Sequence, residues 1–430
     1  MGADGRKIVR GACHLDCPDA CSWDVTVENG RAVDLHGARD HPFTQGNLCV
    51  KVNPYLEHTQ SPDRLLHPLR RVGKKGAGEF ERISWDEALD EISTRFQEVI
   101  AHHGSEAIWP CFGTGNQGFI QGNKGASHRL WNALGASQHR VTICAVAGAA
   151  GTALALGQST GMNPEDLVHS KLIIMWGYNP LSTGNHAWRF ISEARRNGAY
   201  LVAIDPIRTR SAAQADEHIP ILPGTDAALA LGLLHVVVRQ GAEDAVYLER
   251  HTNDWELFRE RILEYSPERV STITKVPVET IVSLGQRLAD TRPTAIRTSM
   301  GMQRHAGGGT AIRTINTIPA VTGDWQRAGG GTIYSTTGAF AANYTKLRQG
   351  DLAPWTTREL TTTLMGRNLL ELDDPPVKAL FVYGANPAAS SPQQDTLRRG
   401  LSREDLFTVV VENFPTDTVD YADIVLPSTM

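Results

Sequence analysis

The chain has 430 residues, of which 41% are hydrophobic and 21% charged, and its formal net charge at pH 7 is −5. These values are those of an ordinary globular protein with two or more domains, and they give no indication of nucleic-acid binding. No apolar run reaches the ~18 residues of a membrane span, and the opening MGADGRKIVRGA shows neither the apolar stretch nor the twin arginine of an export signal. We therefore expect a cytoplasmic protein without disulfides.

Four of the six cysteines lie in the first 49 residues. Cys13, Cys17 and Cys21 follow one another in CHLDCPDAC, and Cys49 stands in GNLCVK. The segment SWDVTVENGRAVDLHG alternates apolar and polar residues about Asn29-Gly30, which predicts a β-hairpin that returns Cys49 to the other three. Structural zinc sites usually carry two C-x2-C pairs, whereas iron–sulfur clusters take four thiolates at family-specific spacings. The spacing favours a [4Fe–4S] cluster over zinc and over unligated thiols.

A stretch without acidic residues begins at Ala107 and ends at Pro164. Within it, GTGNQG (113–118) follows the apolar run AIWPCF, as a phosphate-binding turn follows a strand. Against an NAD site, no acid for the ribose occurs before Glu165, and Pro110 argues against a regular strand. We interpret the loop as part of a cradle for a different cofactor, with Gly113, Gly115 and Asn116 as binding residues.

The last two cysteines have different surroundings. Cys111 stands inside the apolar run AIWPCF, and we predict that it is a small core residue. Cys144 stands in HRVTICAVAG, where a short β-rich run gives way to a helix of small residues. A thiolate is favoured near a helix N-terminus, although a lone cysteine at such a point is more often core than ligand.

The chain contains an internal repeat. LIIMWGYNP (172–180) matches ALFVYGANP (379–387), and each copy leads through a helical stretch to a strand ending in an acid, YLVAIDP and FTVVVENFP. Each copy then closes with Ala-Asp and Leu-Pro-x-Thr. The repeat predicts two related, Rossmann-like α/β modules. Ligands of such modules bind at the carboxyl ends of the strands, where glycine turns direct backbone N–H groups at phosphate.

A second acid-poor stretch lies between Thr291 and Gly350, with Asp324 as its one acid. It contains the glycine-rich runs MGMQRHAGGG and RAGGG. Its basic residues are Arg292, Arg297, Arg304, Arg313, Arg327, Lys346 and Arg348. Two acid-poor, glycine-rich stretches predict a pocket for several phosphates.

The motif CHLDCPDAC … GNLCVK and the segment SPDRLLHPLRRVGKKGAGEFERISWDEALDEI resemble the molybdopterin oxidoreductases, the dimethyl sulfoxide reductase superfamily. The resemblance extends from about residue 10 to the last residue. It implies a [4Fe–4S] cluster beside molybdenum or tungsten, held by the bis(molybdopterin guanine dinucleotide) cofactor. It also implies two-electron redox chemistry on a small-molecule substrate, often with oxygen-atom transfer, and electron relay through the cluster to a partner protein or domain.

The resemblance also assigns residues. Cys144 matches the cysteine that ligates the metal, and a soft thiolate suits a metal already bound by dithiolenes. Lys51 matches a lysine between cluster and pterin, and Cys13, Cys17, Cys21 and Cys49 match the cluster ligands. Expected dinucleotide contacts are Gly177, Asn179, Pro180, Asp205, Gly224, Asp226, Gly301, Gln303, Gly384 and Asn386.

We expect three domains: a β-rich cluster domain at 1–65, one α/β module from 66–150 with 335–430, and another from 151–334. The chain ends in DIVLPSTM, inside the second copy of the repeat, whereas members of the family continue into a C-terminal barrel. The sequence therefore predicts a fragment without that barrel, which should retain the dinucleotides poorly.

Two features bear on the activity. The formate dehydrogenases of the family carry His after the metal-ligating residue, whereas Ala145 follows Cys144, which disfavours formate as substrate. The alternatives are a non-catalytic electron-transfer scaffold of the same fold and a zinc-stabilised binding module. Cys144 and the two glycine-rich stretches argue against the scaffold.

Overall fold

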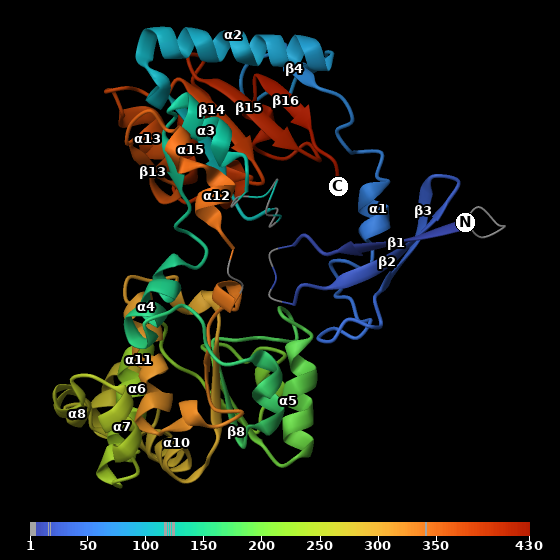
Figure 1. The fold of residues 1–430 in the computed structure, drawn as a ribbon. Coiled ribbons are helices and arrows are strands. Elements are labelled where there is room, and N and C mark those ends of the chain that lie inside the picture. Colours follow the sequence, from blue (N-terminus) through green and yellow to red (C-terminus); the bar gives the residue numbers. More distant parts are fainter. Residues whose placement is uncertain are drawn as a thin grey trace.

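A computed structural model describes residues 6–15, 17, 19–115, 118, 120, 122, 125–339 and 342–430 of the chain. Its fold is mixed α/β, as predicted, and has three parts: a small antiparallel sheet and two larger sheets, each covered by helices on both faces (Figure 1). Within the described residues, no helix combines the length and apolarity needed to cross a membrane.

The small sheet is formed by β1 (Arg6–Ala12), β2 (Ser22–Glu28) and β3 (Arg31–Gly37), in that order. The predicted hairpin is confirmed: β2 and β3 are antiparallel. They are joined by Asn29 and Gly30 at φ 50° and 80°, the left-handed conformation that a two-residue hairpin turn requires. A short helix, α1 (Tyr55–Thr59), leads to the larger sheets.

The lower sheet in Figure 1 has five parallel strands in the order β10-β9-β8-β11-β12. Their bounds are β8 (Leu172–Trp176), β9 (Tyr200–Ile204), β10 (Glu217–Ile219), β11 (Thr294–Thr298) and β12 (Gly331–Ile333). Leu172, Ile174 and Trp176 point to one face, whereas Ile173 and Met175 point to the other. Because both faces are buried, the strands read as continuous apolar runs.

Helices cover both faces of the lower sheet. One face packs on α6 (Asp226–Arg239), α10 (Val278–Asp290) and α11 (Gly308–Val321), and the other on α5 (Ala187–Arg196). Shorter helices complete this part: α7 (Ala245–His251), α8 (Trp255–Leu263) and α9 (Pro267–Thr274).

The upper sheet has the order β5-β4-β16-β15-β14-β6. Its strands are β4 (Leu69–Arg71), β5 (Phe80–Arg82), β6 (Ile108–Phe112), β14 (Ala379–Tyr383), β15 (Phe407–Glu412) and β16 (Ile424–Pro427). The last four are parallel, whereas β4 and β5 are antiparallel. The objection to a strand at Pro110 is therefore wrong. β6 is an edge strand, where proline breaks no ladder hydrogen bond on the open side.

The upper sheet also has helices on both faces. One face packs on α13 (Met365–Glu371) and α15 (Gln394–Leu401), and the other on α2 (Trp85–His103) and α3 (His128–Leu134). The remaining elements are β7 (Gln138–Arg140), β13 (Glu359–Thr361), α4 (Val146–Leu156), α12 (Tyr344–Arg348) and α14 (Pro387–Ser390). Cys111 lies in β6 and is 1% exposed, so its prediction as a core residue is confirmed.

The repeat relates β8, β9 and β10 to β14, β15 and β16 at a constant spacing of 207 residues. Ile173 pairs with Leu201 as Leu380 pairs with Thr408, and Glu217 pairs with Val202 as Ile424 pairs with Val409. This register corrects one detail. Ile219-Pro220 corresponds to Leu426-Pro427, so the match of the two Leu-Pro-x-Thr strings was wrong, because register is set by the ladder and not by a shared tetrapeptide.

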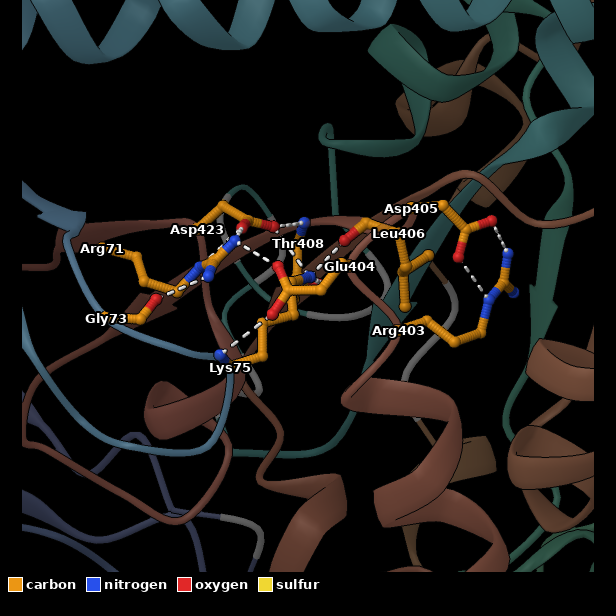
Figure 2. A network of polar contacts seen from close by, with 9 residues as sticks. All are labelled: Arg71, Gly73, Lys75, Arg403, Glu404, Asp405, Leu406, Thr408 and Asp423. Atoms are coloured by element: carbon orange, nitrogen blue, oxygen red, sulfur yellow. Dashed lines mark hydrogen bonds and ion pairs between the residues drawn. The ribbon is translucent and has the colours of Figure 1, made fainter.

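A polar network lies at the amino end of β15 (Figure 2). The Lys75 side chain is fully buried, and its Nζ lies 2.8 Å from Asp423 Oδ2 and 3.2 Å from Thr408 Oγ1. Arg71 lies 2.8 Å from Asp423 and 3.0 Å from Glu404. Burial lowers the pKa of Lys75, and the charge of Asp423 opposes that shift. The network attaches the segment between β4 and β5, which carries Lys75, to β15 and to the residue before β16. It lies at the end of the upper sheet opposite the glycine turns.

Candidate metal and cofactor site

The four N-terminal cysteines line one cavity of about 70 Å³. All four thiols are free, and Cys21 is buried whereas the others are half-buried. Among the described residues, no group of three or more His, Cys, Asp or Glu side chains is arranged to hold one metal ion. The four cysteines nevertheless line the same cavity. A cluster of four irons, with a thiolate at each corner, fits that donor set.

The lower sheet supplies one wall of this cavity. Ser182, Gly184, Asn185 and His186 line it, directly after the turn that follows β8. Lys51 lines it as well. The cavity therefore adjoins the first Gly-x-Asn-Pro turn, which brings the predicted cluster ligands, Lys51 and this turn into one region.

His186 connects both cysteine-bearing segments to the lower sheet. Its Nδ1 donates to Asp19 Oδ2 over 2.7 Å, and its Nε2 donates to the Asn47 carbonyl over 3.0 Å. Burial lowers the pKa of His186, but the hydrogen bonds to Asp19 and Cys21 outweigh burial and raise it to about 10. The imidazolium thus holds the loop of Cys17 and Cys21 and the segment before Cys49. Asp19 and His186 were not among the predicted site residues.

Cys144 lies just before α4, in the connection between the upper sheet and the helices of the lower one (Figure 1). Its Sγ is 3.8 Å from Thr114 Oγ1. The Gln303 amide donates to the Cys144 carbonyl and accepts from Gly148 N over 2.6 Å. Gln303, predicted as a dinucleotide contact, therefore has both polar ends of its side chain bonded to the loop of Cys144.

At the carboxyl ends of the upper sheet, two predicted binding loops meet. Gly113 and Gly115 follow β6, Gly384 follows the adjacent β14, and Gly115 N donates to the Gly384 carbonyl over 2.9 Å. Asn116 lies outside the described residues. The 113–115 turn thus connects the second Gly-x-Asn-Pro turn to the Cys144 thiol through Thr114.

The corresponding end of the lower sheet gathers another set of predicted residues. Asp226 begins α6, is 6% exposed, and accepts from Trp176 Nε1 over 2.9 Å. Its Oδ2 lies 3.9 Å from His305 Nε2. Burial raises the pKa of Asp226, against the hydrogen bond from Trp176. A Cβ placed on Gly224 would lie 3.6 Å from His305 Nδ1, so the turns at Gly224 and at Gly301 approach each other above β8.

The asparagines of the two Gly-x-Asn-Pro turns are braces. Asn179 Oδ1 accepts from Ser211 Oγ over 2.5 Å, and Ser211 Oγ accepts from Leu181 N over 3.0 Å. In the second turn, Asn386 Oδ1 accepts from Thr418 Oγ1 over 2.6 Å, and Thr418 Oγ1 accepts from Ala388 N over 3.1 Å.

The preceding glycines, Gly177 and Gly384, have φ of 60° and 58°. The main chain of each turn is therefore held in the same shape. Ser211 and Thr418 were missed, although each stands four residues before the Ala-Asp of the repeat. That spacing was the signal that could have found them.

Two further predicted residues lie near these turns. Pro180 follows Asn179 in the first turn, and Asp205 follows β9, where its Oδ1 accepts from Ile207 N over 3.1 Å. The repeat makes Glu412 the counterpart of Asp205. Glu412 ends β15, and burial raises its pKa. Glu412 was not among the predicted site residues.

Three arginines of the second acid-poor stretch donate to main-chain carbonyls of the protein. Arg297 is 8% exposed, and its Nη1 donates to the carbonyls of Thr298, Ile333 and Tyr334. Arg292 donates to the Thr322 carbonyl, and Arg304 to that of Ile143. These three guanidinium groups hold main-chain carbonyls and thereby contribute to the shape of the site, and the phosphate pocket stays a prediction.

The comparisons with known proteins match the N-terminal part of the chain and the rest of it to two family models. The model of the family "Molybdopterin oxidoreductase Fe4S4 domain" matches residues 6–61, and that of "Molybdopterin oxidoreductase" matches residues 64–430. The chain belongs to the molybdopterin oxidoreductase family. The resemblance inferred from the cysteine motif is thereby confirmed.

Relatives in this family include the probable oxidoreductase YoaE of Bacillus subtilis, 43% identical over 98% of this chain and 62% of the relative. The dimethyl sulfoxide reductase DmsA of Escherichia coli is 28% identical over 98% of this chain and 58% of that protein. The chain thus spans about three fifths of the length of these relatives. The structure of the acetylene hydratase from Pelobacter acetylenicus matches 96% of this chain and 62% of its own, with a TM-score of 0.81 at 23% identity, which shows a shared fold.

Proposed function

We propose that this chain carries the cofactor-binding machinery of a molybdopterin-dependent oxidoreductase. The reaction class is two-electron redox chemistry on a small molecule, with oxygen-atom transfer as its form. The observation that carries the proposal is the cavity lined by Cys13, Cys17, Cys21 and Cys49 against the segment that follows the Gly177 turn. An electron donor site and a glycine-turn cofactor site are thereby adjacent in one fold.

In this proposal the residues divide into three groups. The four N-terminal cysteines hold a [4Fe–4S] cluster, Lys51 lies between cluster and pterin, and Cys144 ligates molybdenum or tungsten. The dinucleotides of a bis(molybdopterin guanine dinucleotide) cofactor contact the residues at the strand ends: Gly113, Gly115, Gly177, Asn179, Pro180, Asp205, Gly224, Asp226, Gly301, Gln303, Gly384 and Asn386. When bound, the metal centre supplies the two-electron chemistry.

In this proposal the residues of the chain bind and orient the dinucleotides of the cofactor. Leu181 N and Ala388 N are bonded to Ser211 and Thr418, so the two glycine turns have a fixed shape, and a site of fixed shape is preorganised for the phosphates of the cofactor. The buried carboxylate of Asp226 offers acceptors to a base. The domain division at 1–65, 66–150 with 335–430, and 151–334 belongs to this proposal, as does an external electron-transfer partner. Because Ala145 follows Cys144, formate is not the proposed substrate.

The test uses anaerobically purified protein and two cysteines of contrasting surroundings. Metal analysis should find about four irons per chain, and Cys17→Ala should lose them. Cys144→Ala should abolish turnover while the iron content stays unchanged. The matched control is Cys111→Ala, which should retain turnover and lose about 1–3 kcal/mol of stability as a core truncation. Stoichiometric zinc without iron, or normal turnover by Cys144→Ala, would refute the proposal.

A further inference from the structure

We propose that Gln303, Arg304 and Tyr334 are positioning residues that fix the main chain around Cys144 and thereby set where its thiolate stands. The contacts below are independent of any bound group. The consequence for a metal rests on the proposed function, in which Cys144 is the ligand.

Three consecutive carbonyls of the Cys144 loop are each held by a side chain distant in sequence. Arg304 Nη1 donates to the Ile143 carbonyl, and Gln303 Nε2 donates to that of Cys144. Tyr334 Oη donates to the Ala145 carbonyl over 3.3 Å. Loops usually leave such carbonyls to water. Here the main chain is held on both sides of Cys144 as well as at it.

Gln303 has a second function, as the cap of α4. The N-cap residue of this helix is Ala145, which has no side chain that could cap it. Gln303 Oε1 accepts from Gly148 N over 2.6 Å, and Gly148 is the third residue of the helix, the position at which a Ser or Asp cap usually bonds. One amide therefore ties the Cys144 carbonyl to the first turn of the helix that follows.

Two of the three holding side chains are buried, whereas Arg304 is exposed. Gln303 is 7% exposed and Tyr334 2% exposed. Tyr334 directly follows β12, and its carbonyl accepts from Arg297 Nη1 over 2.8 Å. A Cβ on Gly148 would overlap the Tyr334 ring, so only glycine lets α4 approach the tyrosine this closely. The Cys144 loop is thus attached to the rigid carboxyl ends of the lower sheet.

The thiol lies between this attachment and the upper sheet. Thr114 Oγ1, 3.8 Å from Cys144 Sγ, stands in the turn whose Gly115 is bonded to Gly384. A shift of the loop would therefore change the place of the thiolate relative to both glycine turns. Small displacements of a metal ligand change bond length and reactivity.

The experiment measures the thiol directly, without relying on turnover. Protein produced in cells that lack the pterin cofactor is treated with iodoacetamide, and the alkylation rate of the Cys144 peptide is followed by mass spectrometry. Gln303→Ala should raise that rate by roughly tenfold and Tyr334→Phe by roughly threefold, the effects expected for losing two hydrogen bonds or one in a local opening equilibrium. Gln303→Glu keeps the cap on Gly148 but cannot donate to the Cys144 carbonyl, so it loses one hydrogen bond and should raise the rate by roughly threefold, as Tyr334→Phe does.

The matched control is Gln326→Ala, which removes an exposed glutamine bonded to Asp244 Oδ2 over 2.8 Å; it should leave the rate unchanged. In cofactor-loaded protein, Gln303→Glu should alter the electron paramagnetic resonance signal of the molybdenum while the iron signal stays the same. Equal alkylation rates in wild type, Gln303→Glu and Tyr334→Phe would overturn the inference even if Gln303→Ala does not fold. If Cys144→Ala turns over normally, the proposed ligand role of Cys144 fails, and the alkylation rates still decide whether these residues position the loop.

Discussion

The two halves of the repeat place the same carboxylate in two different environments. Asp216 and Asp423 each accept from a strand amide, that of Leu201 over 2.8 Å and that of Thr408 over 2.7 Å. Asp216 then pairs with one half-exposed arginine, Arg195, over 2.8 Å. Asp423 pairs with Arg71 and with the fully buried Lys75 (Figure 2).

The two aspartates differ in burial because of their places in the two sheets. β10 is the edge strand of the lower sheet, so Asp216 lies at the border of that sheet, whereas β16 is followed in the upper sheet by β4 and β5. These extra strands bring the segment with Lys75 over Asp423 and bury the pair. The repeat therefore determines which strand N–H donates to each aspartate. The neighbouring strand determines how deeply the aspartate is buried, and hence how much its ion pair contributes to the free energy of unfolding.

The largest effect should separate these two aspartates. Asp423→Asn leaves Lys75 buried beside a neutral partner, and we expect a loss of about 3–5 kcal/mol in the free energy of unfolding of the upper sheet. The identical change Asp216→Asn leaves Arg195 near water and should cost about 0–1 kcal/mol. Denaturant titration with hydrogen exchange resolved for each sheet measures both. Equal losses would remove the distinction between the two environments.

Raising the pH should sharpen this result. Burial lowers the pKa of Lys75 in the folded protein, so at high pH the unfolded chain binds more protons than the folded one, and stability rises with pH. The deficit of Asp423→Asn should therefore shrink between neutral pH and the ordinary lysine pKa. A deficit that stays constant would mean that the buried charge is not its cause.

Acid should also distinguish the two larger sheets. His139 in β7 is 8% exposed and accepts from Trp109 Nε1 over 3.0 Å, and burial lowers its pKa to about 4. Since the unfolded histidine titrates near 6.5, the upper sheet should lose up to about 3 kcal/mol as the pH falls from about 6.5 to 4.

In the lower sheet, burial raises the pKa of Asp226 and Asp324. Protonation there favours the folded state, so these groups oppose acid unfolding. Hydrogen exchange at pH 7 and pH 5 should show the upper sheet opening first. His139→Gln, which can still accept from Trp109, should abolish the difference; if it does not, other groups control the acid response.

The smallest effect should be equal in the two modules. Ser211 and Thr418 are both fully buried. Ser211→Ala and Thr418→Val each leave a main-chain N–H, that of Leu181 or of Ala388, without its partner. Each also removes one hydrogen bond from an asparagine oxygen, although Asn386 Oδ1 keeps the bond from Thr418 N. We expect about 1–3 kcal/mol for each, with the two values similar. Unequal values would indicate that the two turns are braced by different means, in spite of the common spacing.

The sequence predicted those features that depend on local patterns. The Asn29-Gly30 hairpin, the buried Cys111 and the two Gly-x-Asn-Pro units all follow from turn chemistry or apolar runs, and each is present in the structure. Pro110 misled because the position of a strand in its sheet depends on distant residues.

The features that were missed depend on long-range contacts. Tyr334 and Ala145 are 189 residues apart, and His186 and Asp19 are 167 apart. A tyrosine or histidine gives no local sign of such a partner. The carbonyl partners of Arg292, Arg297 and Arg304 were missed for the same reason, since composition reports a charge but not the main-chain carbonyl that it will meet.

The distribution of strands along the chain has a consequence for folding during synthesis. The lower sheet is continuous from Leu172 to Ile333, whereas the upper sheet joins strands from Leu69–Phe112 with strands from Ala379–Pro427. A ribosome that makes this chain releases β4 and β6 long before their partners β16 and β14 exist, while the lower sheet can fold as soon as β12 emerges. Until Asp423 is made, Lys75 lacks its carboxylate partner, so this ion pair can be buried only after the segment that leads into β16 has been synthesised.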